Sequence, residues 1–498
     1  TSVSAKDVTF FANYAHDGGG MYVQNLNLTG GGLVFEKNYA TNDAAGLYIL
    51  GDDTTNVDIA ASFTDNYVLG SGAALNMIGG AKFAGNLHVT DNIAIHDGGG
   101  IYMLNTAVID LKGNFDDNRS VLGMGGGAYI GNVVTSANIM STFLENQSFG
   151  NGGGLYIYGN TVDDVNMADL TLNLVDFIKN ATLGSGGGAY IFNFRNVVFS
   201  SVNFGSSGTI ASMNGNSAFG DGGGLYIKEV DNFTGKKLGF GDNRAGQSLG
   251  IDIKASNDGL ATGGAAYFLN VGTISMTNMR VSDNRLGGDV RLDEYIHGGI
   301  TVLADKSARR TTTKIEIFNT DFLYNSGASL YVDALKAEIR LDSSSFDNEH
   351  SALSSTAFLS YGAYVKNAAS MYVVNSTFSH NYVNLMVKNL TDTVNGLTIN
   401  FSTIAYAYTR TNNPETIYGG VGLQLDNGTL NISNSIVAYN MIVLNNGVNG
   451  VTVRSSHHNV FENLLSSSSQ AINGFQGTQK QLNNLIWGSD VAGNYIEI

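Results

Sequence analysis

The stretch Asp17-Gly18-Gly19-Gly20-Met21-Tyr22-Val23 decides the fold, because related stretches return throughout the first half of the chain. Gly98-Gly99-Gly100-Ile101-Tyr102-Met103 is a close copy. With Asn76 as a substituted member, the tyrosine recurs at positions 22, 48, 76, 102, 129 and 156, in steps of 26, 28, 26, 27 and 27 residues. Longer steps of 34, 36 and 41 residues lead to Tyr190, Tyr226 and Tyr267, which indicates insertions. A fixed period in this range is typical of a solenoid or a propeller.

A second motif, Phe-x-x-Asn, precedes the tyrosine at a nearly constant interval. Its asparagines stand nine or ten residues before the tyrosine or its substitute, at Asn13, Asn38, Asn66, Asn146, Asn180 and Asn216. The motif returns later as Phe322-Leu323-Tyr324-Asn325 and Phe378-Ser379-His380-Asn381. The repeat therefore continues in a degraded form after residue 270.

A period near 27 residues favours one coil of a parallel β-helix. Two-helix repeats need about 33 residues, whereas three short strands and three turns fill about 27. Coils stack at about 4.8 Å, so roughly 18 coils would extend for about 85 Å. We therefore predict an all-β solenoid, with regular coils over 1–270, degenerate coils over 271–469 with a loop insertion near 289–313, and a C-terminal cap or docking tail over 470–498.

The alternation of side chains around the tyrosine predicts which face is buried. Leu47 and Ile49 flank Tyr48, and Ile101 and Met103 flank Tyr102. Residues on either side of one position share a strand face, so these apolar residues should form the core and the tyrosines should point outward. In-register stacking would also turn the asparagines into a ladder of amide hydrogen bonds.

Composition excludes several classes of protein. The 498 residues include no Cys, one Pro and 64 Gly, and 14% are charged. The absence of Cys excludes disulfides and thiolate metal sites. The formal net charge of −16 argues against nucleic acid as the main partner, and no apolar run is long enough for a transmembrane helix.

The paired Phe-x-x-Asn and Gly-Gly-[apolar]-Tyr motifs resemble the repeats of the polymorphic outer-membrane proteins, which are autotransporter-like bacterial surface proteins. The resemblance covers about residues 1–270 well and 271–465 weakly. It implies a right-handed β-helical passenger that is exposed at a cell surface and acts in adhesion. The third Gly, the dominant Tyr, the lack of cysteines and the lack of a translocator barrel depart from the family pattern, and they leave the anchoring mode open.

The outward tyrosines are the first candidate binding residues. Tyrosine rows can stack on sugar rings or dock a protein, since each ring offers area and a hydroxyl. The alternative is that loops or neighbouring turns cover them. The row consists of Tyr22, Tyr48, Tyr102, Tyr129, Tyr156, Tyr190 and Tyr226.

Acidic residues offer two further hypotheses. Asp17 and Asp43 stand five residues before their tyrosines and one coil apart, where they could share a Ca²⁺ ion, although turn capping is the simpler interpretation. The segment between Asp289 and Arg310 combines carboxylates with bases, as a polysaccharide lyase requires, although a solvated loop has the same composition. The cluster contains Asp289, Arg291, Asp293, Glu294, His297, Lys306, Arg309 and Arg310.

We therefore expect a non-enzymatic, extracellular or outer-cell-surface protein without a resident cofactor, which acts in adhesion or in surface-layer or filament assembly. The alternative function is that of a polysaccharide lyase or glycosidase of the β-helix class. Expected partners are a protein or glycan on a host or neighbouring cell, with end-to-end self-association as a further possibility.

Overall fold

The computed structural model describes most of the chain as β-strands joined by turns, with no helix among the described residues. These residues are 2–160, 167–205, 214–248, 251–252, 261–286, 297–305, 310–348, 360–392, 394–407, 421–426, 428–438, 441–445, 451–456, 460–461, 487–489 and 495–497. The chain divides into two compact units, Thr1–Tyr267 with Leu286–Asp289 and Phe268–Arg285 with Val290–Ile498.

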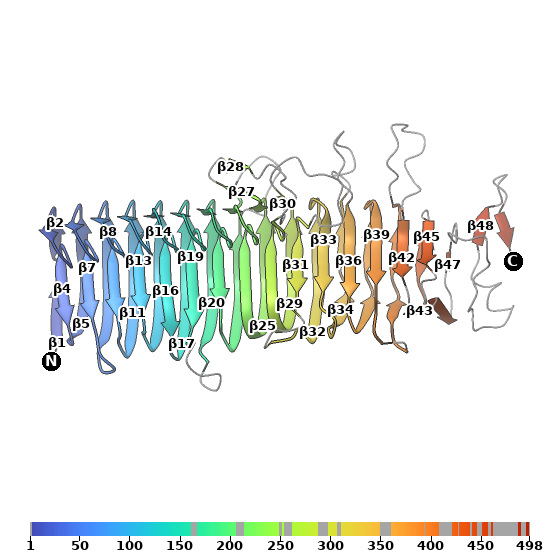
Figure 1. The fold of residues 1–498 in the computed structure, drawn as a ribbon, viewed down its shortest axis with the longest axis horizontal. Coiled ribbons are helices and arrows are strands. Elements are labelled where there is room, and N and C mark those ends of the chain that lie inside the picture. The colour runs from blue at the N-terminus through green and yellow to red at the C-terminus, as the bar shows by residue number, and fades with distance from the viewer. Residues whose placement is uncertain are drawn as a thin grey trace. The chain divides into compact units, whose positions relative to one another are not determined.

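The first unit is a right-handed parallel β-helix: the repeat predicted the parallel β-helix, and the family resemblance implied its hand. One series of short strands carries the tyrosines, and each strand pairs in parallel with its equivalent in the next coil. Figure 1 shows these strands side by side in the blue to green part of the ribbon. They are β4 (Met21–Gln24), β7 (Leu47–Leu50), β10 (Leu75–Ile78), β13 (Ile101–Leu104), β16 (Ala128–Val133), β19 (Leu155–Gly159) and β22 (Ala189–Phe192).

Two more series complete each coil. The longer strands also pair in parallel and are β1 (Ser2–Lys6) with β2 (Thr9–Phe11), β5 (Asn27–Glu36), β8 (Asn56–Thr64), β11 (Lys82–Thr90), β14 (Val108–Asp116), β17 (Ser136–Leu144), β20 (Asp169–Ile178) and β23 (Asn196–Phe204). β25 (Leu225–Gly241) is a single long strand that pairs with β22 through its first part and with β23 through its later part. The third series has two residues per strand: β3 (Tyr14–Ala15), β6 (Tyr39–Ala40), β9 (Tyr67–Val68), β12 (Ile93–Ala94), β15 (Arg119–Ser120), β18 (Gln147–Ser148), β21 (Ala181–Thr182), β24 (Ser217–Ala218) and β26 (Arg244–Ala245).

The second unit repeats the same plan with more irregular coils. β31 (Ile300–Leu303), β33 (Ala328–Asp333), β36 (Tyr361–Asn367), β39 (Val383–Lys388), β42 (Val421–Asp426) and β45 (Met441–Asn445) pair in parallel in that order. The series of longer strands starts with the part of β29 (Ala266–Ser282) that pairs with β32 (Lys314–Leu323). In the following coils each long strand is divided into two shorter ones, as in β34 (Glu338–Asp342) with β35 (Ser345–Asp347) and β37 (Ser370–Val374) with β38 (Thr377–Ser379). Of the expected cap or tail over 470–498, the described part is an antiparallel pair, β48 (Trp487–Ser489) with β49 (Tyr495–Glu497), and the rest lies outside the described residues.

Stacked phenylalanines fill the interior of the first unit. Phe143 has no exposed surface, and its ring stacks on Phe115 and Phe177 with centroids 4.9 and 5.0 Å apart. Buried aromatic rings are favourable at this separation, and most layers of the core repeat the contact, although Val89 interrupts the stack between Phe63 and Phe115. The phenylalanine of the Phe-x-x-Asn motif is therefore the main core residue of most coils.

The asparagines form the predicted ladder at the adjoining turn. Asn118 donates from its backbone N and its Nδ2 to Asn146 Oδ1, at 3.0 Å in both cases, and Nδ2 also donates to a backbone carbonyl. The ladder includes Asn92, Asn118 and Asn243, which the sequence analysis missed. Phe115-x-x-Asn118 and Phe240-x-x-Asn243 carry the motif and could have been found, whereas Asn92 has Val89 in place of Phe.

The glycine triplet is explained by the turn that leads into the tyrosine strand. Gly98 has a φ of 66°, in the left-handed region that favours glycine. A Cβ on Gly99 would collide with the backbone of Arg119 and Gly126 in the next coil. The first glycine therefore allows the turn, and the second allows the coils to approach closely.

Candidate binding face

The tyrosines form two runs of stacked rings on the outward side of their strands, which are separated by Asn76 between Tyr48 and Tyr102. Leu47 and Ile49 are fully buried, while Tyr48 between them points to the opposite side. Successive rings lie 5.1 Å apart for Tyr22 and Tyr48, and 4.8 Å apart for Tyr102 and Tyr129. The stack continues from Tyr129 through Tyr156, Tyr190 and Tyr226 to Tyr267, at centroid distances of 5.0, 5.3, 4.6 and 5.0 Å. Tyrosines at equivalent positions of successive repeats thus stack on one another, and we call this arrangement the tyrosine ladder.

Most rings in the later part of this ladder are less exposed than those in the early coils. The Tyr22 side chain is 47% exposed, and Tyr48 and Tyr102 are partly exposed. Tyr129, Tyr156 and Tyr226 are only 9%, 7% and 8% exposed, whereas Tyr190 among them stays partly exposed. The outward direction does not keep most of the later rings accessible, so a partner would meet the ladder mainly between Tyr22 and Tyr102.

A second outward column explains this difference. Tyr158 lies edge-on to Tyr129 and Tyr156, with ring centroids 6.2 and 6.1 Å away, and Phe192 stacks on Tyr158 at 4.9 Å. Tyr158 leans back over the preceding coil, where a Cβ on Gly131 would meet its ring. The corresponding residues in earlier coils are the smaller Leu50, Ile78 and Leu104, which are only partly buried. The outward face of the early coils is therefore both aromatic and aliphatic.

Burial changes the acid–base behaviour of the ladder hydroxyls. Desolvation raises the pKa of Tyr102 to about 12, and the Asp97 carboxylate adds to the shift. Burial also raises the pKa of Tyr129, Tyr156 and Tyr226 well above the ordinary value of tyrosine. These hydroxyls stay protonated at neutral pH, so they can donate hydrogen bonds but cannot act as bases.

The aspartates before the tyrosines cap the next coil. Asp17 Oδ1 accepts hydrogen bonds from Asn42 Nδ2 at 2.8 Å and from the Asp43 backbone N at 3.1 Å. Asp43 Oδ1 accepts in turn from the Ser71 backbone N at 2.8 Å. These contacts are the turn capping that was weighed against calcium, and no cluster of three His, Asp or Glu side chains suited to a metal occurs within the described parts of the chain.

The pKa shifts of these two carboxyls differ because their burial differs. For Asp17, desolvation raises the pKa, but hydrogen bonds from His16 and Asn42 outweigh it and lower the net value. For Asp43, desolvation dominates and raises the pKa. Asp43 is thus the more costly of the two to keep ionised.

The polar cluster proposed for a lyase falls mostly on residues that the structure does not describe. Asp289, Arg291, Asp293, Glu294, Lys306 and Arg309 lie outside the described residues. Of the remaining two, His297 is 3% exposed and stacks on Tyr331, with ring centroids 3.7 Å apart, and Arg310 is 8% exposed. Neither lies open to solvent as a catalytic base at a substrate groove would.

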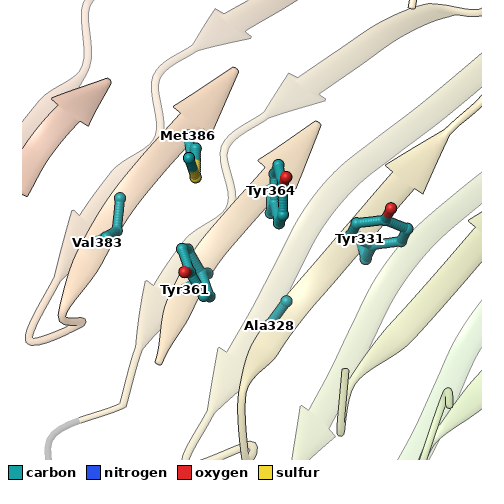
Figure 2. Packing of buried hydrophobic residues seen from close by; sticks show 6 residues of the cluster. All are labelled: Ala328, Tyr331, Tyr361, Tyr364, Val383 and Met386. Atoms are coloured by element: carbon teal, nitrogen blue, oxygen red, sulfur yellow. The ribbon is translucent and has the colours of Figure 1, made fainter. Parts of the chain in front are cut away.

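The second unit also carries tyrosines on its short strands, which the sequence analysis did not follow. Figure 2 shows Tyr331, Tyr364 and Met386 on the neighbouring strands β33, β36 and β39. They belong to one buried cluster with Ala328, Tyr361 and Val383. The signal was present in the sequence, because Gly362-Ala363-Tyr364-Val365 is a shortened copy of the glycine–tyrosine motif.

Comparison with known proteins gives no family for this chain: no family model, no curated protein and no solved structure matches it. Within the described residues there is no helix with the length and apolar character needed to cross a membrane.

Proposed function

We propose that the chain is a non-enzymatic protein of the outer cell surface that acts in adhesion through its tyrosine face. We define the tyrosine face as the outward side chains of the early coils: Tyr22, Tyr48, Leu50, Ile78, Tyr102 and Leu104. The observation that carries the proposal is the stacked, partly exposed ladder, of which Tyr22 is 47% exposed beside an aliphatic column. Rigid aromatic side chains lose little conformational entropy when they bind, so they are common anchors of interfaces.

The fold favours binding over turnover. Within one coil the strands hold the rings at fixed positions, and the ladder repeats them at the strand spacing, so a partner meets several identical contacts at once. The excess of acidic residues limits unspecific sideways association of the chains.

An attachment assay tests the proposal. Beads coated with the full chain should attach to cultured epithelial cells under flow, and albumin-coated beads should not. Tyr22→Ser combined with Tyr48→Ser should lower the affinity by about tenfold or more, because truncating an aromatic anchor commonly costs over 1 kcal/mol. Phe149→Ser is the matched control, since Phe149 is 54% exposed but lies outside the tyrosine face. Equal attachment of the double variant and the control would show that the tyrosine face is not the binding surface. No attachment of the unmodified chain to any cell type would refute adhesion.

Absence of turnover has its own assay. The chain with Ca²⁺ should release no unsaturated product from pectate, alginate or glycosaminoglycan chains. Product that disappears with Arg291→Ala or Lys306→Ala would establish the lyase instead.

A further inference from the structure

The third coil breaks two ladders at once. Asn76 pairs in register with Tyr48 on one side and Tyr102 on the other, so an amide replaces one ring of the stack. In the same coil, Ser71 stands in the column of Asp43 and Asp97, five residues before the ladder position. A small side chain thus replaces a carboxylate five residues before the position where an amide replaces a ring.

The missing ring leaves its two neighbours two strand spacings apart. Neighbouring rings elsewhere in the ladder are 4.6 to 5.3 Å apart. Tyr48 and Tyr102 are separated by two strand spacings, about 10 Å, so a group midway would lie about 5 Å from each ring. A cation interacts favourably with an aromatic face within about 6 Å of its centroid.

The residue at the base of this gap carries an unused acceptor. Asn76 is 1% exposed, and its Nδ2 donates to the Ser71 carbonyl at 3.3 Å. Its Oδ1 accepts no hydrogen bond from any described residue. A buried acceptor without a donor is destabilising, whereas a tyrosine here would simply have continued the stack. The free Oδ1 acceptor of Asn76 therefore favours a ligand that donates a hydrogen bond.

Negative charge flanks the same gap. Asp43 and Asp97 each use Oδ1 to cap the next coil, at 2.8 Å from the backbone N of Ser71 and Met124. Ser71, which Asp43 caps, accepts through its carbonyl from Asn76 Nδ2, and the neighbouring Gly72 N donates to the Asp97 carbonyl at 3.0 Å, so both aspartates lie beside the coil that carries the gap. Asp17 and the imidazoles of His16 and His96 are the other titratable groups around Asp43. Aromatic faces, a carbonyl oxygen and carboxylates all favour a cation with N–H donors.

We propose that this notch, formed by Asp43, Tyr48, Ser71, Asn76, Asp97 and Tyr102, binds the lysine or arginine side chain of a partner protein. The cation lies between the two rings and donates to Asn76 Oδ1, while the carboxylates supply the counter-charge. Asn76 is 1% exposed in the free protein, so side chains around it must move to admit the ligand, and rotamer changes of partly exposed side chains such as Tyr48 and Tyr102 are fast. This site does not depend on the adhesive role proposed above.

Saturation-transfer NMR on the full chain tests the notch with small probes. The probes are the Nα-acetyl methylamides of arginine and lysine, the neutral citrulline analogue, and N-acetylglucosamine. We expect saturation of the arginine and lysine side chains and little saturation of the two neutral probes. Stronger saturation of N-acetylglucosamine would overturn the proposal in favour of a sugar site.

Asn76→Tyr is the decisive variant. It restores the ladder and fills the gap without changing the net charge, so unspecific attraction of cations to the acidic surface stays constant. We expect it to abolish saturation of both cationic probes. Asn138→Tyr, at an exposed position on β17, is the control and should leave saturation unchanged. Undiminished saturation with a folded Asn76→Tyr variant would refute the site.

Asp97→Asn keeps the proposal testable if Asn76→Tyr fails to fold. An amide already caps the same column, since Asn151 Oδ1 accepts from the Ser185 backbone N at 2.8 Å. Removing one of the two flanking carboxylates should weaken binding of both cationic probes, because it takes away an opposite charge beside the cation. An unchanged affinity would show that the cation does not bind at the notch.

Discussion

Replacing Asn118 by alanine should destabilise the coils around it by about 4 kcal/mol. The Asn118 amide makes four hydrogen bonds: Nδ2 donates to Val89 O and Asn146 Oδ1, and Oδ1 accepts from the Asn92 backbone N and Nδ2. All three asparagines have no exposed surface, so water cannot replace these bonds.

The magnitude follows from what remains bonded in the variant. Asn92 Nδ2 still donates to two backbone carbonyls, and Asn146 Oδ1 still accepts from the backbone N of residue 118. The backbone N–H of Asn92 alone loses its acceptor, which costs about 1–3 kcal/mol, and the other three bonds are each worth about 1 kcal/mol net. The sum is about 4 to 6 kcal/mol, and we expect the lower end because the coil can relax.

Hydrogen exchange read by mass spectrometry is the suitable assay, because a solenoid opens locally and a single unfolding free energy is poorly defined. Protection of peptides from β11, β14 and β17 should fall by about a thousandfold, since each 1.4 kcal/mol is a factor of ten. Asn138→Ala is the control, because Asn138 is exposed and its Nδ2 makes one side-chain bond, to Asp110. It should change protection by less than about 0.5 kcal/mol. A similar small effect of Asn118→Ala, or a loss spread evenly over the whole chain, would contradict the ladder as the local source of stability.

Three further outcomes are expected. Phe143→Ala should cost about 3 to 5 kcal/mol, measured as local exchange, because a buried ring leaves a cavity between two coils, whereas Phe149→Ala at an exposed site should be nearly neutral. Spectrophotometric titration should show that Tyr102 ionises near its raised pKa of about 12, and full ionisation by pH 10 in the folded protein would contradict its burial. Because unfolded tyrosine ionises near pH 10, the stability that this shift contributes is complete below pH 10 and should be lost between pH 10 and 12. Burial raises the pKa of Asp221 above 3.8, so the stability contributed by its protonated form is present at lower pH and is lost as pH rises through the folded pKa. Asp221→Asn should therefore raise the melting temperature at pH 7, because an amide can still accept from the Thr262 backbone N, and a lower melting temperature would show that the charge itself is needed.

The sequence by itself determined the repeat, the fold class and the inward face of each tyrosine strand. In a parallel β-helix every coil stacks in register on the next, so a local motif such as Leu47-Tyr48-Ile49 has the same surroundings in each coil. Alternation along one strand then fixes which side chains face the core. The asparagine ladder follows for the same reason, since stacking places equal residues one strand spacing apart.

Only the tertiary structure decided which tyrosines a partner could reach and what the turn carboxylates do. Tyr158 leans over Gly131 and covers Tyr129, a contact that depends on the side chain chosen in the next coil rather than on the motif. Asp43 caps Ser71 because the neighbouring turn presents an N–H at that point, which spacing alone does not reveal. The repeat encodes contacts that recur in every coil, whereas contacts between non-equivalent side chains of successive coils are set by packing in three dimensions.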